Sequence, residues 1–193
     1  QVLDIPSLGV EIRIKWKACP QIALSKMNEV FCVQQHIRFK RSCALDKIGF
    51  GGITVIKRAE EKDIAAIANL AAMMWSNHSV EELNNEFSDL FMKEEAQFFL
   101  KYENDIPVGF AQCQLRYDYV EGTETSPVGY LEGIVVKEGF RHKGYAGALL
   151  AECENWAKSK GCKEFASDCE LDNDASLQFH RAMNFTEANR IIC

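Results

Sequence analysis

The 193-residue sequence has no long apolar run and no export signal at its N-terminus. No stretch approaches the roughly 18 to 20 consecutive apolar residues that a membrane-spanning helix requires. The first residues also lack the basic and then apolar pattern of a signal peptide. These absences exclude an integral membrane protein and predict a protein that stays in the cytoplasm.

The cysteines lack any pattern of a disulfide framework or a zinc site. There is no Cys-x-x-Cys pair and no Cys/His cluster at zinc-binding spacing, which is typical of reduced thiols in a cytoplasmic protein. We therefore expect neither disulfides nor a metal. The eight scattered cysteines are Cys19, Cys32, Cys43, Cys113, Cys153, Cys162, Cys169 and Cys193.

Positive charge is not in excess. The 22 Lys and Arg residues face 28 Asp and Glu residues, giving a formal net charge of -6. This balance argues against a nucleic-acid partner or an anionic membrane surface and is compatible with a cationic substrate. Many cytosolic proteins are as acidic, so charge alone does not choose a substrate.

The chain divides at a glycine cluster, Gly49-Phe50-Gly51-Gly52. Before it, apolar and polar residues mix without a sustained period. We expect residues 1–52 to be an N-terminal extension of unknown role: disordered, non-native, or a real appendage. Residues 53–193 then form one domain, and we expect its last strand to be cut short at Cys193.

Residues after the glycine cluster show regular hydrophobic periods. Strands are expected at 53–57, 96–102, 107–117, 128–136, 163–169 and 185–193, with a hairpin turn at 103–105. Helices are expected at 59–75, 80–93, 144–160 and 173–183. In the helix 144–160, the inward face comprises Leu149, Leu150, Cys153, Trp156 and Ala157.

A buried strand ending at Val136 leads through a basic loop into the helix that begins near Gly144. Free backbone N–H groups and the positive helix end favour an anion there. Gly144 and Gly147, with the small Ala146 between them, let the backbone approach a diphosphate. Arg141-x-x-Gly-x-Ala alone also fits an ordinary basic helix start.

A second pattern, Asn-x-x-Ser-x-x-x-His-x-Ala-x-x-Phe, starts at Asn173 and ends at Phe185. With the Arg-x-x-Gly-x-Ala motif upstream, residues 53–193 resemble the GNAT superfamily of acetyl-CoA-dependent N-acyltransferases. The resemblance implies a mixed α/β fold in which a strongly twisted sheet has helices on both faces. It also implies acetyl-CoA as co-substrate, no metal, and a homodimer.

Several short motifs narrow the resemblance to the aminoglycoside 6'-N-acetyltransferases, which modify the 6'-amino group of drugs such as kanamycin and tobramycin. The motifs are Trp75-Ser76-Asn77-His78, Arg116-Tyr117-Asp118-Tyr119-Val120, Ser126-Pro127, Leu131-Glu132-Gly133-Ile134-Val135-Val136 and Ala166-Ser167-Asp168.

This resemblance implies a site for each substrate. The aminoglycoside would be bound by Trp75, His78, Tyr119, Glu132 and Asp168. Acetyl-CoA would be bound by Ile134, Val135, Val136, His142, Lys143, Gly144, Tyr145, Ala146, Gly147 and Asn173. The backbone after Glu132 can pair with pantetheine amides and polarise the thioester carbonyl, while Glu132 or Asp168 accepts the proton of the attacking ammonium.

Each of these residues also has a structural interpretation. Glu132 fits a strand residue at a sheet edge, Asp168 a turn cap, and Asn173 a helix N-cap. Trp75 and His78 fit a helix end, and Tyr119 a half-exposed strand. His180 lies where many superfamily members have a tyrosine near the leaving sulfur, but as a histidine it also fits a packing role.

Two departures from the family stand near the C-terminus. Asn189 occupies the position of an acidic substrate contact, and Asn184 replaces a glycine. Two alternative functions therefore stay open: acetyl transfer to another amine, such as a polyamine or a protein amine, and a non-catalytic acyl-CoA-binding module.

Overall fold

The computed structural model of the chain describes the backbone of residues 12–18 and 53–192 and the side chains of residues 53–190. The expected boundary at Gly49–Gly52 and the cysteines 19, 32, 43 and 193 lie outside these ranges. None of the described helices combines the length and apolarity that a bilayer span needs.

Every strand and helix expected after residue 52 is present within a few residues of its predicted bounds. The strands are β1 (Ile12–Ala18), β2 (Thr54–Arg58), β3 (Ala96–Glu103), β4 (Ile106–Arg116), β5 (Val128–Val136), β6 (Phe165–Glu170) and β7 (Phe185–Ile192). The helices are α2 (Ile64–Ala71), α3 (Val80–Phe91), α4 (Tyr145–Ser159) and α5 (Asp174–Ala182).

The helix expected at 59–75 is shorter than its hydrophobic pattern. A 3-10 turn at Glu61–Asp63 precedes α2, and α2 ends at Ala71. The chain then turns to begin α3 at the N-cap Ser79, whose hydroxyl accepts a hydrogen bond from the Glu82 N–H at 3.2 Å. This capping box stabilises a new helix start, so the two helices stay separate.

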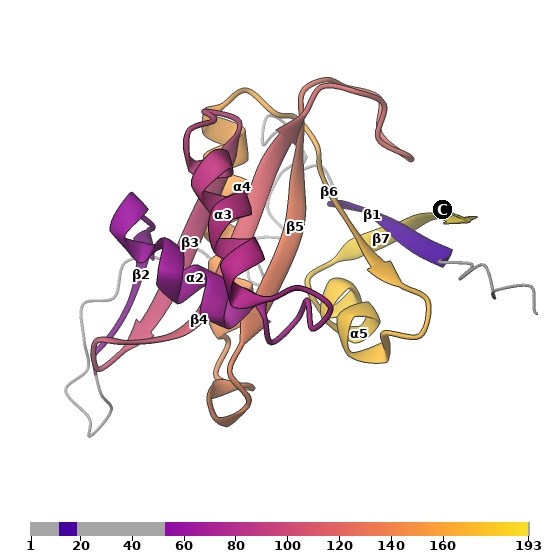
Figure 1. Ribbon diagram of the computed structural model, residues 1–193. Helices are drawn as coiled ribbons and strands as arrows, with labels where there is room; N and C mark the ends of the chain where they lie inside the picture. The colour runs from indigo at the N-terminus through magenta and orange to yellow at the C-terminus, as the bar shows by residue number, and fades with distance from the viewer. Residues whose placement is uncertain (1–11, 19–52, 193) are drawn as a thin grey trace, which may run out of the picture.

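The helices cover both faces of the sheet. Figure 1 shows α2 and α3 in front of the strands and α4 behind them. In front, Ile67 and Phe87 pack with Phe98 and Phe110 of the sheet. Behind, the predicted inward face of α4 is confirmed, since all five of its residues are buried.

The seven described strands form one sheet in the order β2-β3-β4-β5-β6-β1-β7. Neighbours are antiparallel except β5 and β6, which are parallel. β1 lies between β6 and β7 and pairs with both, with Lys15 opposite Asp168 on one side and Asn189 on the other. Part of the N-terminal extension is therefore a strand of the sheet.

The sheet opens into a fork between β5 and β6. Their pairing covers only Gly129–Leu131 and Phe165–Ser167, and the Ser167 hydroxyl donates to the Leu131 carbonyl at 3.1 Å. Beyond these residues the two described strands separate (Figure 1). Backbone groups that a full β5–β6 ladder would pair are therefore not paired between these two strands, and we call the point where they diverge the fork.

Candidate active site

Glu132 and Asp168 are the first residues of the fork on β5 and β6. Glu132 is also the extra residue of a β-bulge, because Gln112 pairs with Gly133 while Cys113 pairs with Leu131. A bulge leaves its extra residue outside the ladder and re-aims the side chain. Register and bulge together therefore place both predicted carboxylates at the apex of the fork.

Tyr130 links the two carboxylates electrostatically. The side chain is fully buried, and burial raises the pKa of its hydroxyl far above the ordinary value. The charge of Asp168 and a hydrogen bond to it raise the pKa further, and Glu132 adds a smaller rise. The phenol therefore stays protonated at neutral pH and donates to Asp168.

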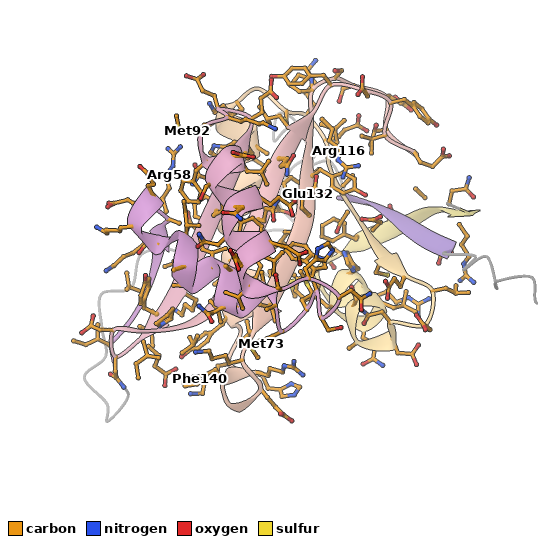
Figure 2. The ribbon with its side chains drawn as sticks, viewed as in Figure 1. Arg58, Met73, Met92, Arg116, Glu132 and Phe140 are labelled. Carbon is orange, nitrogen blue, oxygen red and sulfur yellow. The ribbon has the colours of Figure 1, made fainter. Side chains whose placement is uncertain are left out.

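Arg116, at the end of β4, binds Glu132 with its guanidinium (Figure 2). Burial lowers the pKa of Arg116, but the hydrogen bonds and charge of Glu132 outweigh it and raise the pKa above the ordinary value. Sequence reasoning placed Arg116 in a motif without giving it a role. The signal that was missed is that a half-buried glutamate needs a cation or a hydrogen-bond donor beside it.

Of the three remaining residues predicted to line the acceptor site, the structure brings only Trp75 to the bulge. A Cβ on Gly133 would lie 2.5 Å from the Met74 methyl group and 3.0 Å from two atoms of the Trp75 ring, so a side chain at this position would push both residues away from β5. His78 is exposed, and Tyr119 is 79% exposed with its hydroxyl donating to Glu121 at 3.1 Å. These two side chains therefore lie at the surface.

A pocket of about 280 Å³ lies where β5 ends and α4 begins. Six of its lining residues are among those predicted to bind the coenzyme: Val136, His142, Gly144, Tyr145, Ala146 and Gly147. Its other lining residues include Phe179 of α5 and Met183, the residue that follows α5, which sequence reasoning did not select. A Cβ on Gly147 would lie 3.2 Å from the Met183 sulfur, so the glycine keeps this pocket open.

The loop before α4 has the backbone geometry of an anion site. His142 and Gly144 have φ values of 61° and 78°, in the left-handed region. The Arg141 side chain donates to the Val136 carbonyl at 3.1 Å and closes the loop. Left-handed residues next to the unpaired N–H groups of a helix start make a concave surface that binds phosphate.

The family model described as "Acetyltransferase (GNAT) family" matches residues 62–185, which include the fork and the pocket. This chain belongs to the GNAT acetyltransferase family. The predicted fold is thereby confirmed, and the match leaves out β1.

Relatives and solved structures match most of this acetyltransferase. Aminoglycoside N(6')-acetyltransferase type 1 of Acinetobacter haemolyticus is 37% identical over 137 residues, 71% of this chain and 94% of the relative. The structure of aminoglycoside N-acetyltransferase AAC(6')-Iy in complex with CoA has a TM-score of 0.73 and 30% identity, covering 76% of this chain and 97% of its own. The structure of AAC(6')-Iy in complex with the bisubstrate analog CoA-S-monomethyl-acetylneamine has a TM-score of 0.70 and 30% identity, and the match covers 73% of this chain and 96% of its own.

Two residues of the predicted coenzyme site in this acetyltransferase also contact Glu103 of β3. The Lys143 ammonium lies 3.1 and 3.2 Å from the two Glu103 oxygens, and the Tyr145 hydroxyl donates to the same carboxylate. Burial and this carboxylate raise the pKa of Tyr145 to about 12. Lys143 is directed to Glu103, while the Tyr145 ring lines the pocket.

Asn173 and His180 have structural partners within α5. The Asn173 side chain accepts from the Ser176 N–H at 3.0 Å, so it is an N-cap. His180 Nδ1 lies 2.8 Å from the Ser176 carbonyl, which can only accept, so Nδ1 carries the proton. Burial lowers the pKa of His180, which leaves a neutral ring without an Nε2 proton and disfavours it as the acid for the thiolate.

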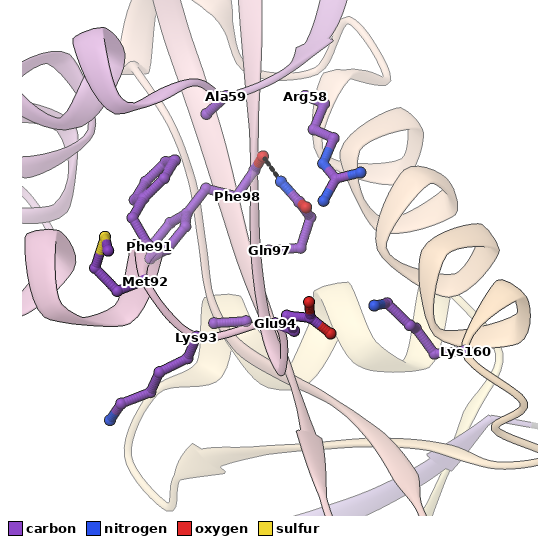
Figure 3. A pocket seen from close by; sticks show the side chains of 10 residues that line it. Arg58, Ala59, Phe91, Met92, Lys93, Glu94, Gln97, Phe98 and Lys160 are labelled. Atoms are coloured by element: carbon purple, nitrogen blue, oxygen red, sulfur yellow. Dashed lines mark hydrogen bonds between the residues drawn. The ribbon is translucent and has the colours of Figure 1, made fainter.

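A second cavity of about 320 Å³ lies at the start of β3, beside the end of β2 (Figure 3). Arg58, Lys93 and Lys160 line it with a single carboxylate, Glu94. It includes none of the residues predicted from the sequence, and its three cations would repel a cationic acceptor. This larger cavity is therefore not the one that the sequence predicted.

The described cysteines lie in the interior. Cys113, Cys153 and Cys162 are buried free thiols, and Cys169 is also buried. Within the described ranges, no group of three or more His, Cys, Asp or Glu side chains is arranged to hold a metal ion.

Proposed function

We propose that this enzyme transfers the acetyl group of acetyl-CoA to the 6'-amino group of aminoglycoside antibiotics and thereby confers resistance to them. The observation that carries the proposal is the fork, where Glu132 and Asp168 meet on the same sheet that forms the pocket at the start of α4. Relatives covered almost over their full length bear the name of this activity.

For the coenzyme, we propose that the loop and helix start from His142 to Gly147 bind the pyrophosphate. Five of these six residues line the pocket, which supports the assignment. Lys143 does not line it, and its positive charge would attract the phosphates from beside the pocket. Ile134, Val135 and Val136 would pair with the pantetheine amides along the open edge of β5. Asn173, the N-cap of α5, is not among the residues that line this pocket, and it would contact another part of the coenzyme.

For the acceptor, we propose Trp75, His78, Tyr119, Glu132 and Asp168. The close packing of Trp75 on Gly133 supports a wall of the site beside the carboxylates. His78 and Tyr119 are exposed, and they would contact the outer part of a bound antibiotic. An acidic apex suits a polycation, because opposite charges attract strongly where water is partly excluded.

The chemistry is a direct transfer between the two bound substrates. Glu132 or Asp168, directly or through water, accepts a proton from the acceptor ammonium, and the freed nitrogen attacks the thioester carbon. A backbone N–H after the bulge stabilises the oxyanion of the tetrahedral intermediate. The C–S bond then breaks, and CoA leaves as a thiolate that takes up a proton.

We also propose a homodimer in the cytoplasm. The family resemblance supports the dimer, and the buried free cysteines support a reducing compartment. Light scattering after size-exclusion chromatography tests the dimer.

The first experiment measures thiol release from acetyl-CoA on addition of kanamycin or tobramycin, with mass analysis of the product. Release that depends on the antibiotic, with one acetyl group on the 6'-amine, is the expected result. Binding of acetyl-CoA without turnover on either drug, or turnover only on polyamines or peptides, would overturn the proposal.

The proton acceptor is tested with Glu132→Gln and Asp168→Asn. Loss of the acceptor carboxylate should lower kcat by about 100-fold or more and remove the acidic limb of the pH–rate profile. A Glu132→Gln enzyme that keeps the full rate and pH profile would exclude Glu132 from this role and leave Asp168.

A further inference from the structure

Arg116 binds both oxygens of Glu132. Its Nε and Nη2 donate to Oε1 at 3.0 and 2.9 Å, and Nη2 donates to Oε2 at 2.8 Å. A carboxylate offers about four acceptor positions, so most of the capacity of Glu132 is used by this one side chain. An acceptor ammonium that makes more than one hydrogen bond to Glu132 must therefore take positions that Arg116 holds.

Tyr130 holds the guanidinium in place. The Arg116 Cζ lies 3.5 Å from the centroid of the Tyr130 ring, and that ring is fully buried. Stacking on a fixed aromatic surface orients the guanidinium and makes it a well-placed cation. Asp168 also lies within electrostatic range of Arg116, so the guanidinium is part of the acidic apex of the fork.

Arg116 is more exposed to solvent than Glu132. The Arg116 side chain is 39% exposed, whereas that of Glu132 is 18% exposed. Arg116 is the last residue of β4, next to the connection that carries the exposed Tyr117 and Tyr119. The guanidinium is therefore the more accessible partner of the pair, at a position where the chain leaves the sheet.

We propose that Arg116 is a specificity-determining residue that occupies the cation subsite at Glu132 and competes with the acceptor's ammonium groups for that carboxylate. The inference rests on the proposed function of the fork as the acceptor site. Its consequence is selection by charge: an acceptor with several ammonium groups displaces or shares the guanidinium, whereas a monoamine gains too little to do so.

The test compares wild type with Arg116→Gln, using KM for kanamycin, Kd from calorimetry, and the ionic-strength dependence of both. Loss of the competing cation should lower KM and Kd by about fivefold at low salt, and the salt dependence should become steeper. An unchanged or raised KM, with unchanged salt dependence, would show that Arg116 is only structural.

Two variants separate this effect from a change in total charge. Arg190→Gln removes the same charge from the exposed pair in which Arg190 Nε lies 2.7 Å from Glu187, and it should leave KM unchanged. The double variant Arg116→Gln/Glu132→Gln restores the charge balance of the fork, and its KM should return to the wild-type value or above. A double variant that binds as tightly as Arg116→Gln would contradict competition at Glu132.

Arg116→Lys covers the case in which Arg116→Gln does not fold, as judged by thermal melting. A lysine keeps the charge but not the forked geometry, so it should hold Glu132 less firmly and lower KM by a smaller factor. A lysine variant with wild-type or higher KM would overturn the inference. If wild type itself acetylates no aminoglycoside, the proposed function fails, independently of any ratio between variants.

Discussion

At the scale of single residues, the site depends on charges whose partners lie on other strands. The sequence identified Glu132 and Asp168 because a carboxylate within an apolar run needs an explanation. It could not assign Arg116 to Glu132, because that pair joins β4 to β5 through a register that includes a bulge. The role of Tyr130 was hidden for the same reason, since its burial and its contact with Asp168 come from the tertiary fold.

A prediction for pH follows from His180. The ring is 2% exposed and its pKa is lowered by burial, whereas in the unfolded chain the pKa is about 6.5. Between these two values the unfolded state holds more protons, so stability falls as pH falls through this window, by up to about 1.4 kcal/mol per pH unit. Urea unfolding at pH 7.5, 6.5 and 5.5 should show this loss.

The matched variants are His180→Gln and His78→Gln. Glutamine cannot titrate but can still donate to the Ser176 carbonyl, so His180→Gln should flatten the pH dependence. His78→Gln removes a histidine from the surface and should leave the wild-type profile. Equal slopes for wild type and His180→Gln would contradict a buried neutral His180.

At the scale of elements, local sequence patterns predicted most of the helices and strands that the structure describes. The inward face of α4 and the bounds of β5 followed from periodicity, because these patterns depend only on nearby residues. β1 could not be predicted, since both of its partner strands come from the far end of the chain. The fork also depends on strands that are distant in sequence, so it could not be predicted. The glycines at the start of α4 could be predicted, because they act on the backbone of their own loop.

The connection from β4 to β5 is anchored by one buried carboxylate, Glu164. Its Oε2 accepts from the backbone N–H groups of Glu124 and Thr125 at 2.8 and 2.7 Å, and from the Thr125 hydroxyl at 2.6 Å. The same connection carries Tyr119, and a Cβ on Gly122 would lie 2.3 Å from Ala188 of β7. This segment is therefore held from two sides.

We expect Glu164→Ala to release this connection. Unfolding free energy should fall by about 2 kcal/mol because three part-buried hydrogen bonds lose their acceptor. The KM for the aminoglycoside should rise while the KM for acetyl-CoA stays the same. Glu164→Gln keeps one acceptor oxygen and should have a smaller effect on both quantities. If the KM values for the aminoglycoside and for acetyl-CoA rose by the same factor, the effect would not be confined to this connection.

At the scale of the whole molecule, the N-terminal strand joins β7 to the rest of the sheet. Within the described ranges β7 pairs only with β1, and β7 supports the connection at Gly122 and, through the Asn189 amide, at Glu121. The strand β1 of the N-terminal extension therefore supports β7, and β7 in turn supports the connection between β4 and β5.

Trp16→Pro tests that coupling. Proline cannot donate to the ladder, and β1 has a strand on each side, so the variant should lose about 3 kcal/mol of unfolding free energy. Deletion of residues 1–52 removes β1 altogether and should also lower the melting temperature. A deletion that melts like wild type would show that β1 adds nothing to the fold in solution.

The fork has one more consequence, which concerns self-association. An unpaired strand edge attracts the edge of another chain, and proteins normally protect such edges. Among the described residues, no strand pairs with the β6 side of β5 beyond Leu131, and the proposed partner for that edge is the pantetheine arm of acetyl-CoA. The co-substrate would then act as a removable edge strand, and we expect the enzyme to be most prone to aggregation when acetyl-CoA is scarce.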